Sequence, residues 1–275
     1  MSSVVPSSAI VLCGGQSSRM GRAKAWLPWR GRPVLAHVVR VLREVVDDVV
    51  VVAAGDQDVP AVEARIVRDR EPGLGPLAGI AVGLAHAEGK LAYVTATDAP
   101  HLTAAFVRSL LGFGSAAAPE IDGIVQTLSA VYPTDAAVTA DAVLAAGRRR
   151  PLDLLGAVDF RRVAADELPD LQSILGFNTP DAYLAAVRRA EPGAEAVLEL
   201  AGRAAEVADP RLRKVPVGSL AAILAEVAEG VELVEGDRVA KAFAITLDRR
   251  CRLRDPRAPV GPGEHLLVHD APVEV

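Results

Sequence analysis

Short apolar runs that alternate with helical segments are the feature that most constrains the fold of this chain. Residues 9–12, 49–54 and 92–96 are runs of small and β-branched apolar residues, and a loop with Gly or Asp follows each of them. Residues 33–44 and 77–87 lie between these runs and carry apolar side chains at helical spacing. Strands that alternate with helices predict an α/β, Rossmann-like, doubly wound sheet of parallel strands.

The apolar pattern continues in the middle of the chain. Residues 121–132 are expected to form one further strand, and residues 136–146, which contain few helix breakers, are expected to form a helix. The side chains expected to share one face of that strand are Ile124, Leu128, Ala130 and Tyr132. The core sheet is therefore expected to extend through this region.

The length of 275 residues exceeds that of most single domains, so two domains are expected. A helix expected at 180–189 is followed by the sequence Glu191-Pro192-Gly193, which joins both helix-breaking residue types. We therefore predict a first domain over residues 1–190 and a second over residues 194–275.

The predicted second domain differs in character from the first. Three strand-like runs and one helix with a serine cap follow one another, at 196–200, 219–228, 242–247 and 265–268. Strands that flank a single helix in so short a span predict a small α+β module with a mixed sheet.

The composition excludes several classes of partner. Thirty Lys and Arg against 35 Asp and Glu give a net charge of −5, without the basic surplus that nucleic acid or an anionic membrane attracts. The two cysteines show no metal-binding spacing. Residues 1–8 contain no Lys or Arg, and Asp residues interrupt the apolar stretches well before the roughly 18 residues of a membrane span. We expect a cytoplasmic protein that binds neither nucleic acid nor membrane.

A glycine-rich loop follows the first predicted strand. Its residues are Leu12, Cys13, Gly14, Gly15, Gln16, Ser17, Ser18 and Arg19, with Lys24 close behind. Successive glycines let backbone N–H groups approach a phosphate, serine hydroxyls add donors, and lysine adds a mobile positive charge. The spacing differs from that of the P-loop and of GxGxxG. We predict a phosphate-binding loop, and the alternative is an ordinary strand-to-helix turn with solvated charges.

Asp98 follows the strand predicted at 92–96, so its carboxylate is expected at the edge of the sheet where ligand crevices form. Mg²⁺ commonly takes one or two carboxylates and completes its coordination with phosphate oxygens and water, which one Asp at this edge supports. The alternative role of Asp98 is to cap a helix that begins near Pro100. Asp69, in a charged loop, is a second candidate for a nucleotide contact.

These motifs together resemble the molybdenum cofactor guanylyltransferases, which are MobA-like NTP transferases. Residues 12–24 are similar to the family's LxGGxSxRMGxxK signature, and residues 73–80 resemble its second glycine loop. Residues 97–100 match its metal-binding Asp-x-Pro turn, and residues 178–180 resemble its late nucleotide element. Four such motifs in the same order make the resemblance specific over about the first 190 residues.

The resemblance implies a reaction and a set of site residues. The reaction is Mg²⁺-dependent transfer of GMP from GTP to molybdenum-molybdopterin, giving the guanine dinucleotide form and pyrophosphate. The implied catalytic residues are Lys24, Arg19 and Asp98, of which Asp98 also binds Mg²⁺. The implied nucleotide contacts are Leu12, Cys13, Gly14, Gly15, Ser17, Lys24, Asp69 and Gly75. The implied partners are proteins of molybdenum cofactor biosynthesis or the molybdoenzymes that accept the cofactor.

Two positions depart from the family pattern. Ala99 stands where the family usually has Met, and Ala54-Gly55 stands where an Asn usually follows the second strand. The second departure falls among the positions that the resemblance connects with guanine.

The tail resembles a second family. Residues 197–204 and 260–265 are similar to the β-grasp, ubiquitin-like sulfur carriers of the MoaD and ThiS type. Such a carrier needs a C-terminal Gly-Gly, whereas this chain ends in Glu274-Val275. We therefore expect a docking or structural module in place of a sulfur carrier.

Two other functions stay open at this point. One is a different nucleotidyltransferase, of the cytidylyl or sugar-phosphate type, which the preferred NTP would distinguish. The other is a non-catalytic carrier of nucleotide or cofactor, for which binding without turnover would be diagnostic.

Overall fold

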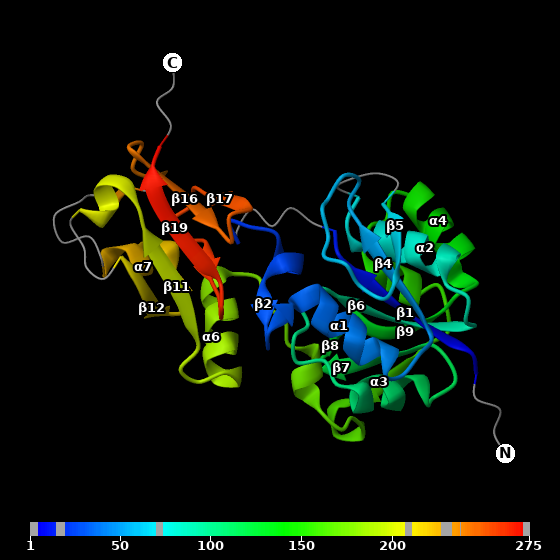
Figure 1. Cartoon of the computed structure of the whole chain (residues 1–275). Helices are drawn as coiled ribbons and strands as arrows, with labels where there is room; N and C mark the ends of the chain where they lie inside the picture. Colours follow the sequence, from blue (N-terminus) through cyan, green and yellow to red (C-terminus); the bar gives the residue numbers. More distant parts are fainter. Residues whose placement is uncertain are drawn as a thin grey trace. The chain divides into compact units, whose positions relative to one another are not determined.

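Two compact units make up the computed structural model of the chain (Figure 1). The structure describes residues 5–14, 20–69, 74–206, 211–226, 233–236 and 238–271. Unit 1 comprises Met1–Gln16 and Val34–Gly176, and unit 2 comprises Ser17–Pro33 and Phe177–Val275. Each unit is a set of residues that pack mainly against one another. The sequence domains 1–190 and 194–275 stay a prediction.

Unit 1 carries strands and helices in alternation over most of its length. Its strands are β1 (Ser7–Leu12), β4 (Asp48–Ala53), β5 (Arg65–Arg68), β6 (Leu91–Ala96), β7 (Ala117–Ile121), β8 (Ile124–Val125), β9 (Ser129–Pro133) and β10 (Arg161–Ala164). Its helices are α1 (Val34–Arg43), α2 (Pro76–His86), α3 (Ala104–Leu111), α4 (Ala136–Ala145) and α5 (Pro151–Leu155), with short 3-10 turns η2 (Ala165–Glu167) and η3 (Leu171–Ile174). Across the described ranges of the whole chain, no helix has the length and apolar character needed to cross a membrane.

The strands of unit 1 form an eight-stranded sheet in the order β10-β7-β9-β6-β1-β4-β5, with β8 paired to β7. Strand β1 lies parallel to both β4 and β6, and β4 lies parallel to β5. Strand β9 runs antiparallel to its neighbours β6 and β7. The predicted α/β fold is therefore confirmed, with β8 and β9 reversed within an otherwise parallel sheet.

The single strand predicted over residues 121–132 is wrong. Asp122 and Gly123 both have positive φ, 50° and 77°, and they reverse the chain between β7 and β8. Two central residues with positive φ are typical of a type I′ hairpin turn, for which Asp-Gly is a favoured sequence. Ile124 is consequently 65% exposed instead of sharing a buried face with Tyr132. The Asp-Gly pair was the signal that would have identified the hairpin.

Helices cover both faces of this sheet (Figure 1). Helices α2, α4 and α5 share an apolar core with one face, while α1 and α3 pack against the strands from the other. In β1 and β4 the side chains on both faces of the sheet are buried, which explains why those strands are continuous apolar runs. A methyl group on Gly83 of α2 would lie only 2.5 Å from Ile10 Cγ2. Helix α2 can therefore pack directly on β1.

Unit 2 combines a short N-terminal segment with the last third of the chain. Its helical segments are η1 (Lys24–Trp26), α6 (Pro180–Ala190), η4 (Gly202–Ala205) and α7 (Leu220–Ala225). Its strands are β2 (Pro28–Trp29), β3 (Arg32–Pro33), β11 (Glu195–Leu200), β12 (Leu212–Pro216), β13 (Gly218–Ser219), β14 (Val234–Glu235), β15 (Arg238–Val239), β16 (Phe243–Leu247), β17 (Cys251–Leu253), β18 (Pro259–Val260) and β19 (His265–Asp270).

A five-stranded mixed sheet forms the centre of unit 2, in the order β12-β11-β19-β16-β17. Strands β11 and β19 are parallel, and the other pairs are antiparallel. Apolar residues of α7, among them Leu220, Ile223 and Leu224, join the buried core of this sheet. The sheet and helix confirm the α+β class predicted for the tail, and the narrower assignment to the β-grasp fold stays a prediction.

Candidate functional site

Hydrogen bonds fasten the ends of four strands together at one edge of the unit 1 sheet. The carbonyl oxygen of Leu12 accepts from both the backbone N–H and the hydroxyl of Thr97, at 3.1 Å in each case. The N–H of Cys13 donates to Val52 O at 2.8 Å, and the N–H of Asp69 donates to Ala53 O at 2.8 Å. The loops after β1, β4, β5 and β6 therefore begin side by side. Ligand crevices of open α/β sheets form at this edge.

The first glycine loop begins at this edge with an accessible backbone. Gly14 is exposed, and among the described residues beyond its chain neighbours the heavy atom nearest to a methyl group placed on it would be Ala54 N, at 3.8 Å. The predicted contacts Gly15, Ser17 and Arg19 lie outside the described residues. The start of the loop, directly after β1, lies next to the turn that follows β6.

Cys13 is a buried residue of this loop. Burial raises the pKa of the Cys13 thiol, against weaker opposing effects from Thr97, Arg68 and Gln57. Because the thiolate is the reactive form, a thiol with a raised pKa stays protonated and inert near neutral pH. Cys13 can therefore contribute its backbone and packing to the site and does not support covalent catalysis.

Asp98 lies in the turn that follows β6, as predicted. The alternative role as a helix cap is wrong, because α3 begins at Ala104 and Thr103 is its cap, accepting from Phe106 N at 3.3 Å. Gly176 approaches closely: a methyl group there would lie 2.8 Å from the backbone oxygen of Asp98. Asp98 is half-buried at the strand-end edge, held between the end of β6 and this late glycine.

Asp69 presents a buried carboxylate oxygen at the same edge. Within the described part of the chain, its Oδ1 has no hydrogen-bond partner, although the atom is shielded from solvent. A buried acceptor without a donor is costly, by about 1–3 kcal/mol, unless a ligand or an ordered water satisfies it. Neighbouring Arg68 is engaged elsewhere, donating to the carbonyl oxygens of Ala54 and Gln57. Asp69 is thus suited to accept a hydrogen bond from a bound molecule.

The second glycine loop leads into the first turn of α2. Gly75 precedes the helix with φ of +85° and ψ of −179°, a conformation that residues with a side chain rarely adopt. As far as the described residues show, no side chain caps the helix, and Pro76 occupies its first turn. The N–H groups of that turn and the positive end of the helix dipole are therefore available to an anion.

Lys24 is held within unit 2 by a residue from a distant motif. Its Nζ donates to Asn178 Oδ1 at 2.8 Å, across 154 positions of sequence. Asn178 directly precedes Thr179, which caps α6 by accepting from Ala182 N at 3.2 Å. The structure thus brings together the end of the first motif and the late Asn-Thr-Pro motif. Asn178 is therefore a site candidate. Its motif could be recognised in the sequence, but its hydrogen bond with Lys24 could not.

The chemistry of these donors suits a hard divalent cation such as Mg²⁺ or Mn²⁺ better than Zn²⁺. Among the described residues, no group of three or more His, Cys, Asp and Glu side chains is placed to hold a metal ion. Zn²⁺ commonly takes three or four protein ligands, whereas Mg²⁺ is held by one or two carboxylates together with phosphate oxygens and water. Asp98 is a single carboxylate beside a glycine loop, so its surroundings suit a hard divalent cation that also binds phosphate oxygens and water.

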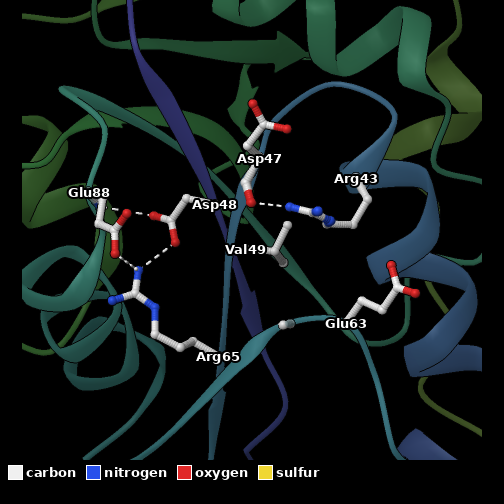
Figure 2. Close-up of a pocket in the computed structure, with 8 residues that line it drawn as sticks. Arg43, Asp47, Asp48, Val49, Glu63, Arg65 and Glu88 are labelled. Carbon is white, nitrogen blue, oxygen red and sulfur yellow. Dashed lines mark hydrogen bonds and ion pairs between the residues drawn. The ribbon is translucent and has the colours of Figure 1, made fainter.

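A second hollow lies at the opposite edge of the sheet. It lies at the start of β4, where the guanidinium of Arg65 contacts both Asp48, at 2.5 Å, and Glu88, at 3.2 Å (Figure 2). Burial acts to raise the pKa of Asp48, but hydrogen bonds from Ser8, Glu88 N and Arg65 outweigh it and leave that pKa lowered. Arg65, Asp48 and Glu88 thus tie the starts of β4 and β5 to the segment before β6.

The fold and the site define a nucleotide-binding α/β domain with two glycine loops and carboxylates at one strand-end edge. A model of the MobA-like NTP transferase domain matches residues 9–165. A protein of Mycobacterium tuberculosis named "Probable molybdenum cofactor guanylyltransferase" is 38% identical over 188 residues, which cover 64% of this chain and 94% of that protein. The chain belongs to the MobA-like NTP transferase family, and it is a nucleotidyltransferase.

Solved structures agree with this assignment. Molybdopterin-guanine dinucleotide biosynthesis protein A from Archaeoglobus fulgidus matches 67% of this chain and 96% of its own, with 25% identity and a TM-score of 0.55. The 2-C-methyl-D-erythritol 4-phosphate cytidylyltransferase from Thermus thermophilus matches 68% and 98%, with 18% identity and a TM-score of 0.51. The second likeness shows the shared fold.

Proposed function

We propose that this chain transfers GMP from GTP to the terminal phosphate of molybdopterin that carries molybdenum. A phosphate oxygen of the acceptor attacks the α-phosphorus of GTP, the bond from that phosphorus to the bridging oxygen breaks, and pyrophosphate leaves. The products are the guanine dinucleotide form of the cofactor and pyrophosphate. The relatives named as guanylyltransferases support this choice of substrates.

One observation carries the proposal: the double hydrogen bond from Thr97 to Leu12 O. It joins the strand that leads into the first glycine loop to the strand that leads into Asp98. A triphosphate on that loop would therefore lie beside a carboxylate, as a metal-dependent phosphate transfer needs.

The proposal gives the residues at this edge distinct roles. The backbone of Leu12 to Gly15 and the hydroxyl of Ser17 would cradle the phosphates, and the N–H groups after Gly75 would add donors. The buried oxygen of Asp69 would accept a hydrogen bond from the nucleoside. Lys24 and Arg19 would stabilise the negative charge that develops on the transferred group and on the leaving pyrophosphate.

Proton transfer is not needed to start this reaction. The attacking phosphate is largely a dianion near neutral pH, because its second pKa is about 6. Positioning and charge stabilisation therefore supply the rate enhancement. Asp98 would hold Mg²⁺, whose positive charge, when bound, offsets the repulsion between the two phosphate groups.

The proposed reaction is tested by product identity. The full chain is incubated with molybdenum-loaded molybdopterin, MgCl₂ and each of GTP, CTP, ATP and UTP in turn. We expect the guanine dinucleotide mass and stoichiometric pyrophosphate only with GTP. The same mixture with EDTA in excess over the divalent cation is expected to give neither product.

Other outcomes of that assay point elsewhere. A cytosine dinucleotide would replace the guanylyl assignment by a cytidylyl one, and pyrophosphate release only with a sugar phosphate as acceptor would reject molybdopterin. Turnover unchanged in EDTA would reject the cation. A cytoplasmic location, and docking to proteins of molybdenum cofactor biosynthesis or acceptor molybdoenzymes, remain predictions of the same proposal.

Gly176 offers a test of how strictly Asp98 must be placed. In Gly176→Ala the added methyl group would meet the backbone oxygen of Asp98 at 2.8 Å, so the turn that carries the carboxylate and the segment around residue 176 must move apart. A displacement of this kind is expected to lower kcat by about 10- to 100-fold. Steady-state kinetics at saturating GTP measure the effect, and circular dichroism checks the fold.

Gly156→Ala is the matched control for that substitution. Its added methyl group would meet its nearest heavy atom, Leu152 O, at 3.4 Å, so little has to move. We expect kcat within about twofold of the unchanged chain. Equal losses in the two variants would show that the Gly176 effect has nothing to do with Asp98.

A further inference from the structure

Within unit 2, residues 20–29, the segment that carries Lys24, pack against α6 and against residues 194–271, here called the C-terminal module. Gly21 has φ of +66°, and a methyl group on it would lie 3.1 Å from Ala258 Cβ. A few residues on, Pro28 O accepts a hydrogen bond from Tyr183 Oη at 2.7 Å. A methyl group on Gly261 would lie 2.5 Å from Pro28 Cγ. The segment is therefore in close contact with the loop that precedes β19.

A buried ion pair lies at the centre of this contact. The guanidinium of Arg22 donates to both carboxylate oxygens of Glu264, at 2.6 and 2.7 Å. The two side chains are only 8% and 6% exposed. Arg22 also donates to Pro259 O at 3.2 Å, and Gly261 N donates to the Glu264 carboxylate at 2.8 Å. The guanidinium and the carboxylate are thus each held by a backbone group as well as by one another.

Such a pair fixes geometry more than it adds stability. Burying two charges costs much of what their attraction returns, so an apolar pair of similar volume would stabilise the fold about as well. A two-pronged contact between guanidinium and carboxylate, however, allows only one relative orientation. The pair therefore sets where the backbone of residue 22 lies relative to the C-terminal module.

That constraint passes directly to Lys24. Residues 24–26 form the short helical turn η1, closed by hydrogen bonds from Trp26 N to Ala23 O and from Leu27 N to Lys24 O. Ala25 and Leu27 are buried, so the turn cannot shift alone. The position of the Lys24 side chain thus depends on where Arg22 is held.

We propose that Glu264 is a positioning residue for Lys24, so that the C-terminal module determines where a predicted phosphate contact of this chain is held. The module would act by holding the Arg22 guanidinium and, through it, the turn that presents the lysine amine. The inference rests on the proposed function in one respect, since Lys24 is taken as a phosphate contact.

The first test asks whether Glu264 holds this segment. Hydrogen exchange is followed at the backbone amides of residues 22–27 in the full chain and in Glu264→Gln, which keeps the side-chain shape and removes the charge. We expect exchange at Trp26 and Leu27 to become about tenfold faster, with the amides of β16 unchanged. Unchanged exchange at residues 22–27 would overturn the inference.

The second test asks whether Glu264 acts through Lys24. The dissociation constant of GTP with Mg²⁺ is measured for the unchanged chain, Glu264→Gln, Lys24→Met and the double variant. We expect Glu264→Gln to weaken binding about tenfold in the unchanged chain and to have no further effect in the Lys24→Met chain. Equal and independent effects in both backgrounds would overturn the inference.

Two further variants keep the outcome clear. Glu195→Gln removes an exposed pair with Lys214 in the same module and is expected to change neither readout. If Glu264→Gln does not fold, the Arg22→Met/Glu264→Met pair removes both charges together and should fold, with the same two effects expected. Absence of GTP binding by the unchanged chain would count against the proposed function alone, because hydrogen exchange would still decide whether Glu264 holds the segment.

Discussion

Replacing Asp98 by alanine is expected to lower the rate of dinucleotide formation by about 1000-fold or more while leaving the chain folded. The carboxylate is the proposed ligand of the divalent cation, and two phosphate groups must come together in the reaction. Without the cation their repulsion is not offset. The measurement is kcat at saturating GTP and MgCl₂, with the midpoint of thermal unfolding measured in parallel.

Asp135→Ala is the matched control for this experiment. Asp135 is an exposed carboxylate before α4 and makes no capping hydrogen bond, and the adjacent Thr134 N donates to Lys90 O, just before β6 begins. It therefore lies at the sheet edge away from Asp98. Its loss should leave kcat unchanged and move the unfolding midpoint by less than about 2 °C. Near-normal turnover in Asp98→Ala would reject the role given to that residue.

Lys24→Met is expected to lower kcat/KM by about 100-fold or more. Methionine preserves most of the length of the side chain and removes the charge. The loss should appear mainly in kcat if the amine stabilises charge that develops in the transition state, and mainly in KM if it only binds the triphosphate. Initial rates over a range of GTP concentrations separate the two cases.

Lys241→Met provides the comparison for a loss of positive charge within the same unit. Lys241 is exposed and precedes β16. Its substitution should leave both kinetic constants within about twofold of the unchanged chain. A similar loss in both lysine variants would mean that net charge, and not the position of Lys24, governs activity.

The buried centre of the sheet could be predicted from sequence because its strands are apolar on both faces. The runs at 9–12, 49–54 and 92–96 correspond to β1, β4 and β6. Strand β5 at the sheet edge was not predicted. It is only four residues long, begins and ends with arginine, and leaves Ile66 40% exposed. Strands with one solvated side lack the continuous apolar signal.

Individual site residues could be predicted from the sequence, whereas their proximity in the folded chain could not. A glycine pair or an aspartate directly after an apolar run is a local signal, so Gly14 and Asp98 could be found. Their adjacency depends on which strands are neighbours, and the bond between Thr97 and Leu12 spans 85 positions. The bond between Lys24 and Asn178 spans 154. Contacts between residues so far apart in the chain produce no periodic pattern in a single sequence, so they could not be predicted from it.

The packing of residues 17–33 with residues 177–275 has a consequence for how this gene can be shortened. A cut after residue 176 would retain the sheet and both glycine loops, yet it would remove Tyr183 and Glu264, the partners of Pro28 and Arg22. The shortened product would keep an arginine whose guanidinium had lost its counterion. Truncation at residue 176 is therefore expected to loosen residues 20–29, because the side chains that hold this segment within unit 2 are lost.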